Sequence, residues 1–155
     1  MSTPTLPVPS GKLSEQIQAV WWLLSRTDHT KDGQKRIDPA LGENPAGILA
    51  YAKNHFSAQF MKHDRTEIDR PQSFNKGQNN TQASGGYDAY FGTYEVDEQN
   101  GKVLHTLLGS VIPANIGLTV SRDLRVNRDE LIIQLETTTP DAEPITRTLI
   151  WKRIS

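Results

Sequence analysis

Three residue types that handle protons and charge stand on strand-like segments in the second half of the chain. Tyr94, His105 and Arg122 each lie in an apolar run, where an aliphatic side chain would pack as well. An imidazole can move a proton near neutral pH, a phenol can act as a partner acid, and a guanidinium can stabilise negative charge that develops on an oxygen. We therefore take these three residues as candidate catalytic groups, with Gln59 as an alternative anchor for a carbonyl or oxyanion.

Each of these side chains also has an ordinary structural explanation. A buried tyrosine often only satisfies its hydroxyl, a strand histidine is more often a core residue than a catalyst, and a buried arginine can belong to a structural ion pair. Together they indicate the wall of an apolar cavity with polar tips, because a small barrel either fills its interior or holds one ligand. The residues expected to contact a ligand there are Tyr51, Gln59, Met61, Tyr90, Val103, Leu107 and Trp151.

The alternation of side chains along two of these strands predicts which face is the interior. In the segment 86–97, Tyr94 lies on the face opposite Glu95, whose carboxylate would be costly to bury unpaired. In the following segment, we expect the charged Lys102 to face water. Because side chains alternate along a strand, His105 and the other odd-numbered residues should then point inward. Tyr94 and His105 are therefore expected to meet inside the protein as the reacting pair.

Strand patterns fill most of the chain, which predicts an all-β domain. We expect strands at 20–27, 34–38, 47–53, 55–63, 86–97, 102–112, 117–126, 130–138 and 145–154. Turn signals stand between them at Asp32-Gly33, Lys53-Asn54, Asn100-Gly101 and 127–129. Short sequential strands joined by hairpin turns favour a closed antiparallel up-and-down barrel of about eight to ten strands.

Three further segments complete the expected domain organisation. Residues 1–12 are expected to form a loosely held arm, and 13–155 a single barrel domain. Leu13, Ile17 and Val20 stand at helical spacing, with Ser10 as an N-cap, which predicts a short helix before the first strand. The polar stretch 64–85 is expected to be either a lid over a cavity or a disordered loop.

Composition excludes several classes of function. A net charge of −1 and the absence of long basic runs argue against nucleic acid and membrane docking. The absence of cysteine excludes disulfides, thiol catalysis and thiolate metal sites, and the four histidines show no metal-binding spacing. We find no phosphate loop or nucleophile elbow and no signal-peptide pattern, so we expect a cytoplasmic protein without metal or cofactor, as a monomer or homodimer.

The chain resembles the small lipocalin-like domain proteins of bacteria and fungi. The resemblance runs from "WWLLS" (21–25) through "NPAGILAY" (44–51) and "FSAQFM" (56–61) to the closing "LIWKR" (149–153), and it is densest in "GYDAYFGTYEVDEQNGKVLH" (86–105). It implies a closed calycin-type barrel with a central cavity for a small apolar ligand. It also implies that Trp21 packs against Arg153 and closes one end of the barrel, in a cation–π contact worth about 1 kcal/mol beyond burial.

Two functions are compatible with this fold, because such barrels serve as carriers and as enzymes. The first is a cofactor-independent isomerase, cyclase or dehydratase that acts on a hydrophobic polyketide- or terpenoid-like secondary metabolite. The second is a non-catalytic carrier or sensor, in which the same polar groups orient the ligand. A filled barrel without a cavity is a third possibility. The presence of His, Tyr and Arg on core strands favours the enzyme, since a carrier needs little more than an apolar lining.

Overall fold

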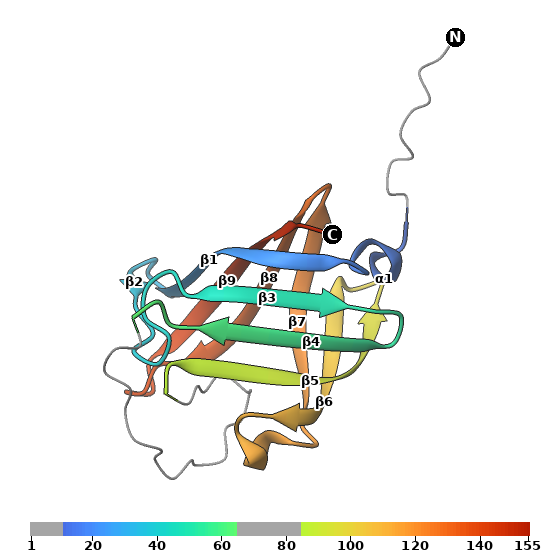
Figure 1. Ribbon diagram of the computed structural model, residues 1–155. Coiled ribbons are helices and arrows are strands. Elements are labelled where there is room, and N and C mark those ends of the chain that lie inside the picture. The colour runs from blue at the N-terminus through green and yellow to red at the C-terminus, as the bar shows by residue number, and fades with distance from the viewer. Residues whose placement is uncertain (1–10, 65–84) are drawn as a thin grey trace.

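An antiparallel β-sheet makes up most of the computed structural model, which describes residues 11–64 and 85–155 (Figure 1). Its strands are β1 (Val20–Thr30), β2 (Lys35–Arg36), β3 (Ala46–Tyr51), β4 (His55–Met61), β5 (Tyr87–Asp97), β6 (Lys102–Ser110), β7 (Thr119–Asn127), β8 (Glu130–Thr138) and β9 (Pro144–Arg153). The helices are α1 (Leu13–Gln16) and the 3₁₀ turn η1 (Pro113–Asn115). All nine predicted strands are present, with boundaries that differ by a few residues. The expected arm, the Ser10 cap and nearly all of the loop 64–85 lie outside the described residues.

Pairing between the first and last strands closes this sheet into a barrel. The strand order is β2-β1-β3-β4-β5-β6-β7-β8-β9, and β1 also pairs with β9 from Trp21↔Arg153 to Thr30↔Ile145. Eight strands therefore form a closed ring, while the short β2 pairs only with the far end of β1. The predicted closed antiparallel up-and-down barrel is confirmed.

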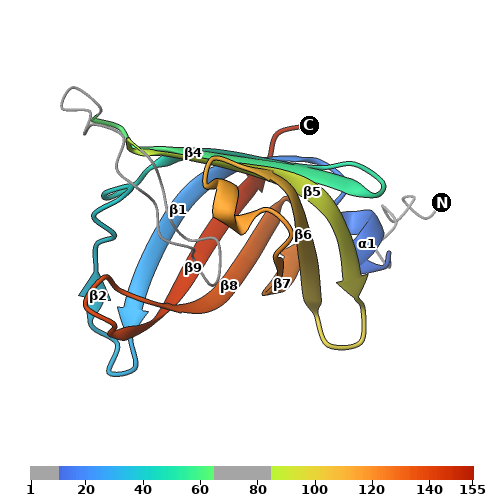
Figure 2. The same ribbon diagram turned by 90° about the horizontal axis from the view of Figure 1, so that it is seen from below.

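The connections differ at the two ends of the barrel, which we name after the elements found there. At the α1 end the strands are joined by short turns, at 52–54, 98–101 and 128–129. At the β2 end the connections are longer and include 31–45 and the η1 segment (Figures 1 and 2). A barrel whose turns are short at one end and long at the other has room for a site at the second end.

The helix at the start of the described chain is shorter than predicted. It ends at Gln16, and Val20 already belongs to β1. Its first amides are bound by a side chain distant in sequence, because Leu13 N and Ser14 N donate to the two carboxylate oxygens of Glu98 at 2.6 and 3.1 Å. A carboxylate at this position satisfies otherwise unpaired amides and holds α1 against the β5–β6 turn. In residues 11–64 and 85–155, no helix is long and apolar enough to span a membrane.

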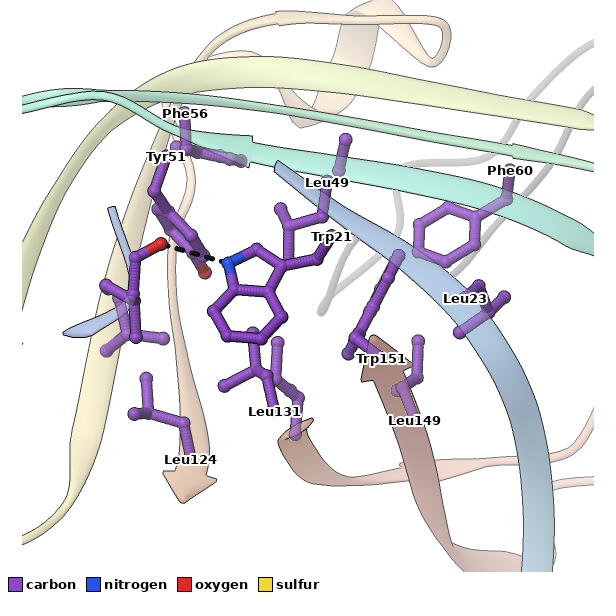
Figure 3. Packing of buried hydrophobic residues seen from close by; sticks show 14 of the residues in the cluster. Trp21, Leu23, Leu49, Tyr51, Phe56, Phe60, Leu124, Leu131, Leu149 and Trp151 are labelled. Atoms are coloured by element: carbon purple, nitrogen blue, oxygen red, sulfur yellow. Dashed lines mark hydrogen bonds between the residues drawn. The ribbon is translucent and has the colours of Figure 1, made fainter. Parts of the chain in front are cut away.

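Aromatic packing seals the α1 end of the interior. Trp21 is fully buried, and its Nε1 donates to the carbonyl oxygen of Ile17 at 3.0 Å (Figure 3). The guanidinium carbon of Arg153 lies 4.5 Å from the centre of the Trp21 ring, and Arg153 also donates to the carbonyl oxygen of Gln16 at 3.0 Å. The predicted pairing of Trp21 with Arg153 is confirmed. It ties the last strand to the first strand and to α1.

The contribution of this closure can be measured with a pair of neighbouring substitutions. We expect Arg153→Met to lower the free energy of unfolding by about 1–2 kcal/mol, because it removes the cation–π contact and the bonds to carbonyl oxygens. Lys152→Met is the matched control, since Lys152 is exposed on the outer face of the same strand. Urea unfolding of both variants is the measurement. Equal losses in the two variants would show that the Arg153 contact contributes nothing specific.

Candidate functional site

A β-bulge in β1 places charged side chains inside the barrel. Before the bulge, Trp21 and Leu23 point inward, and after it the register against β9 shifts by one residue, at Leu24. Leu24 itself is 53% exposed. The shift changes which residues face inward, so that Arg26 and Asp28 point into the barrel instead of toward solvent. Re-aiming of side chains is a common effect of a bulge.

The charges that enter in this way form a buried cluster at the β2 end. Arg147 of β9 donates from Nε and Nη2 to the two oxygens of Asp28, at 2.8 and 3.0 Å. Asp38, in the connection between β2 and β3, accepts from Arg26 at 3.0 Å and from Arg147 at 3.5 Å. All four side chains are at most 11% exposed. Two arginines and two carboxylates compensate each other, which offsets the cost of removing them from water.

A cavity of about 40 Å³ adjoins this cluster and is partly open to solvent. Its lining combines an apolar part with a charged and polar part: Leu49, Ala58, Phe60, Ile133, Leu135, Leu149 and Trp151 form the first, and Arg26, Asp88, Tyr90, His105, Arg122 and Arg147 the second. Four of the apolar residues are labelled in Figure 3. Pockets for drug-sized ligands typically measure roughly 300–1,000 Å³. The cavity therefore has room for a head group of a few atoms and not for a whole ligand of that size.

Several residues that line this cavity have a buried polar atom without a partner. Within residues 11–64 and 85–155, the buried side-chain atoms without a hydrogen-bond partner are Asp88 Oδ1, His105 Nδ1, Arg147 Nη1 and Trp151 Nε1. All four belong to residues that line the cavity. A buried polar group without a partner is destabilising by about 1–3 kcal/mol, and such groups are rare in native proteins. Their concentration at one place identifies the cavity as the candidate site.

His105 is hydrogen-bonded to a phenol from across the barrel. Its Nε2 lies 2.6 Å from the hydroxyl of Tyr51, and its ring stacks on Phe56 at 4.0 Å between centroids. Burial raises the pKa of Tyr51 well above its usual value, so the phenol keeps its proton. The direction of its hydrogen bond with Nε2 depends on the tautomer of His105, and Nδ1 carries the imidazole proton when the phenol donates. Burial, and next the charge of Arg122, lower the pKa of His105 to about 3, so the ring is neutral at physiological pH.

Asp88 is the ionisable group of the cavity that titrates near neutral pH. It lies at the start of β5, is 4% exposed, and faces the same interior as Tyr90. Burial raises its pKa to about 7, against the opposing effects of Arg26, of the Ala89 amide and of Arg147. Burial likewise raises the pKa of Tyr90 to about 12, with Asp88 as the next contributor. Asp88 can therefore hold or release a proton at physiological pH, whereas Tyr90 stays protonated.

The structure brings part of the predicted site together. His105, Arg122, Tyr90 and Trp151 line the cavity. Val103 and Leu107 are buried in the barrel but do not line it, and Tyr51 reaches it only through His105. The predicted inward orientation of Tyr94 and His105 is correct, and Glu95 is exposed as expected. Whether any of these residues is catalytic stays a prediction.

Two parts of the prediction require correction. Tyr94 and His105 are direct cross-strand neighbours on the inner face, as predicted, but the phenol that is hydrogen-bonded to His105 is Tyr51. The Tyr94 hydroxyl donates instead to the carbonyl oxygen of Ala52 at 2.5 Å, at the α1 end. Gln59 and Met61 point to the outside of β4, where both are exposed and where Gln59 accepts a hydrogen bond from Tyr87. Both residues alternate along β4 with Ala58 and Phe60, which are buried, so they lie on the other face of the strand.

Sequence reasoning missed Asp88, Arg26, Asp28, Asp38 and Arg147. For two of them the sequence contained a signal. Asp88 lies an even number of residues from Tyr90 and Tyr94, so it faces the same side of its strand, and Arg147 is related in the same way to Leu149 and Trp151. An ionisable residue on a face assigned to the interior is a site candidate. Alternation along the strand does not identify Arg26 and Asp28, because the bulge changes which residues of β1 face inward. It does not identify Asp38 either, because Asp38 lies in a connection outside the strands.

The raised pKa of Asp88 makes a specific prediction about stability. Its carboxyl titrates at its usual value of 3.8 in the unfolded chain and at about 7 in the barrel. Stability from this group is therefore lost as the pH rises from about 4 to 7, because the folded state retains a proton that the unfolded state has released. We expect Asp88→Asn to match the wild type at pH 4 and to be more stable by roughly 2–4 kcal/mol at pH 8.

Urea unfolding at the two pH values is the measurement, and Glu95→Gln, on the exposed face of the same strand, is the control. An Asp88→Asn variant whose stability relative to the wild type is the same at pH 4 and pH 8 would contradict the raised pKa.

Comparison with known proteins adds one match. A family model described as a lipocalin-like domain matches residues 19–154. This range takes in all nine strands and leaves out α1. No curated protein matches the sequence.

Proposed function

Because the chain belongs to the lipocalin-like domain family, we propose that its barrel binds a small apolar molecule whose polar head group occupies the interior cavity. The observation that carries this proposal is that four of the residues lining one cavity each have a buried polar atom without a hydrogen-bond partner. A polar head group that enters the cavity could supply partners for these atoms. The apolar half of the lining, which includes Leu49, Phe60 and Leu149, suits a hydrophobic body.

The size of the cavity limits how such a ligand is bound. At about 40 Å³ the cavity accepts the head group alone, so the apolar body must extend toward solvent or displace neighbouring side chains. At the α1 end the interior holds large side chains, since Trp21 and Leu131 are fully buried there. Ligand recognition is expected at the opposite half of the interior.

Binding is tested with the neutral fluorophore N-phenyl-1-naphthylamine. We expect saturable binding to the wild type with one site per chain, seen as enhanced emission. Ala58→Leu should weaken it about tenfold, because it adds three carbons to the cavity wall and overpacking typically is unfavourable by 1–3 kcal/mol. Ser57→Leu is the matched control, since Ser57 pairs with Ala50 and Phe91 on the outer face.

Circular dichroism establishes that both variants are folded, and Ile133→Phe, elsewhere on the cavity wall, is the second cavity-filling variant. Equal affinities in cavity and surface variants would place the fluorophore outside the barrel and would contradict the proposal.

A second candidate function is a cofactor-free isomerase, cyclase or dehydratase of a hydrophobic secondary metabolite. One observation favours it: Asp88, with a pKa of about 7, is a proton acceptor and donor matched to physiological pH inside the cavity. Its carboxylate could take a proton from a carbon next to a carbonyl and return it to another carbon of the same molecule. Arg122 and the His105 Nδ1–H could stabilise the enolate oxygen.

This candidate moves the proton-transfer role from His105 to Asp88. A pKa of about 3 makes His105 too weak a base for the task at neutral pH, and Tyr94 is not at the cavity. The two assignments predict different variants to fail. Asp88→Asn should lower proton transfer about 10²-fold if Asp88 is the base, and His105→Ala should do so if the sequence-based pair is correct.

Deuterium exchange of the enolisable ketone 2-tetralone, followed by NMR in heavy water, is the measurement. We expect the wild type to exceed buffer catalysis and to lose this excess in Asp88→Asn, with Glu95→Gln unaffected. A wild type that does not exceed the buffer rate would remove the enzymatic candidate and leave ligand binding standing.

A further inference from the structure

The chain between β2 and β3 lies at the β2 end of the barrel and sends two side chains into the interior (Figures 1 and 2). We refer to its residues 37–44 as the β2–β3 segment. Asp38, whose side chain is 11% exposed, contacts the buried arginines, and Leu41, which is 1% exposed, belongs to the hydrophobic core. Glu43 and Asn44 are exposed. The segment therefore has one side in the interior and the other in water.

Asp38 attaches the β2–β3 segment to two residues that line the cavity. Its Oδ2 accepts from Arg26 at 3.0 Å and from Arg147 at 3.5 Å, and its Oδ1 accepts from the Ala40 amide of the segment itself at 2.9 Å. Arg26 and Arg147 belong to β1 and β9, so one carboxylate joins the segment to both strands of the seam that closes the barrel. Hydrogen bonds between charged partners are the stronger ones.

The backbone of the β2–β3 segment adds little to this attachment. Among the residues that the structure describes, its one backbone–backbone hydrogen bond is internal and runs from Gly42 N to Asp38 O. In its second ion pair, Glu43 with Lys35 at 3.5 Å, both side chains are more than half exposed, and such pairs contribute little. Segments with few backbone hydrogen bonds to their neighbours open more easily than paired strands. The Asp38 contacts and the burial of Leu41 therefore hold the segment in place.

Arg26 lies between the cavity and the space beneath the β2–β3 segment. It lines the cavity of the candidate site, and it also lines a smaller pocket of about 10 Å³ that Asp28 and Asp38 border as well. This pocket is partly open to solvent. Movement of Asp38 away from the barrel would remove the carboxylate that holds Arg26 at 3.0 Å, whereas Arg147 would keep its two bonds to Asp28.

Resting on the proposed ligand-binding function, we propose that the β2–β3 segment is a gate of the cavity and that the contacts of Asp38 with Arg26 and Arg147 are its latch. In the conformation of the structure the latch is closed and holds Arg26 between the cavity and the surface pocket. In the open state Asp38 and Leu41 leave the interior, and a ligand passes Arg26 into the cavity. Because opening separates a buried ion pair and exposes an apolar side chain, the open state is the minor one.

A gate has a kinetic signature that a purely structural contact lacks. If the same latch closes the ligand-free and the ligand-bound barrel, its loss raises the association and dissociation rate constants by the same factor and leaves the dissociation constant unchanged. A residue that contacts the ligand changes the dissociation constant instead. In the wild type, the observed rate constant of binding should level off at high ligand concentration, at the rate at which the gate opens.

Stopped-flow fluorescence with N-phenyl-1-naphthylamine measures these rate constants. We expect Asp38→Asn to raise both about tenfold or more, with the dissociation constant within about twofold of the wild type, because it removes the charge of the latch and keeps an oxygen for the Ala40 amide. Glu43→Gln is the matched control, since it makes the same change at the exposed ion pair of the same segment and should leave both rate constants unaltered. Circular dichroism establishes that both variants are folded.

A reversible cross-link tests the gate in the opposite direction. A Cβ atom at Gly42 would lie 3.6 Å from Cγ of Lys62, at the position where a cysteine sulfur would be, so Gly42→Cys combined with Lys62→Cys brings two thiols within reach of a disulfide. The chain has no other cysteine. We expect the oxidised double variant to bind the fluorophore about tenfold more slowly, or not at all, compared with the same protein after reduction. The reduced form has the same two substitutions, and mass spectrometry verifies the disulfide.

The outcomes separate the gate from the proposed function. If the fluorophore binds saturably, with a rate constant that rises linearly with its concentration and is the same in the wild type, in Asp38→Asn and in the oxidised cross-link, the gate is wrong and ligand binding stands. If one variant does not fold or does not form its disulfide, the other decides, and the wild-type concentration dependence decides if neither is obtained. A fluorophore that does not bind to the wild type overturns the proposed function and the gate together.

Discussion

Pairing between β1 and β9 makes the interior of this protein possible. The two strands pair along most of their length, and the seam carries both the Trp21–Arg153 contact at one end and the Asp28–Arg147 ion pair at the other. Without that seam the sheet would have two open edges and one of its faces would lie in water. With it, one face becomes an interior in which an unpaired charge is costly. The properties of the candidate site follow from this enclosure.

Enclosure acts in opposite directions on the acid and the base of the cavity. Burial raises the pKa of Asp88 and lowers that of His105, because in each case it favours the neutral form. Near neutral pH the imidazole is therefore uncharged throughout, while the carboxyl is close to its midpoint. The same physical cause removes one residue from acid–base chemistry and makes the other suitable for it. Residue type alone favours the histidine as the group that exchanges protons near neutral pH, whereas the effect of burial favours the aspartate.

The fold was predictable from sequence because its signals are local. Turn residues such as Asn100-Gly101 and period-two alternation mark each strand, and Glu95 and Lys102 orient a hairpin by the cost of burying them. The site was less predictable because its contacts cross the barrel. Tyr51 and His105 lie on strands that are not neighbours in the sheet, so no pairing argument joins them. The bulge at Leu24 has no local signature and inverts the facing of the residues that follow.

The seam also has a consequence for how the protein is made. Asp28 and Arg147 are separated by 119 positions, and β9 is translated after the other eight strands of the described sheet. Domains begin to fold during synthesis, but a chain that stops short of β9 has no closing strand and no partner for the Asp28 carboxylate. The barrel interior is therefore completed only after β9 has been translated and pairs with β1.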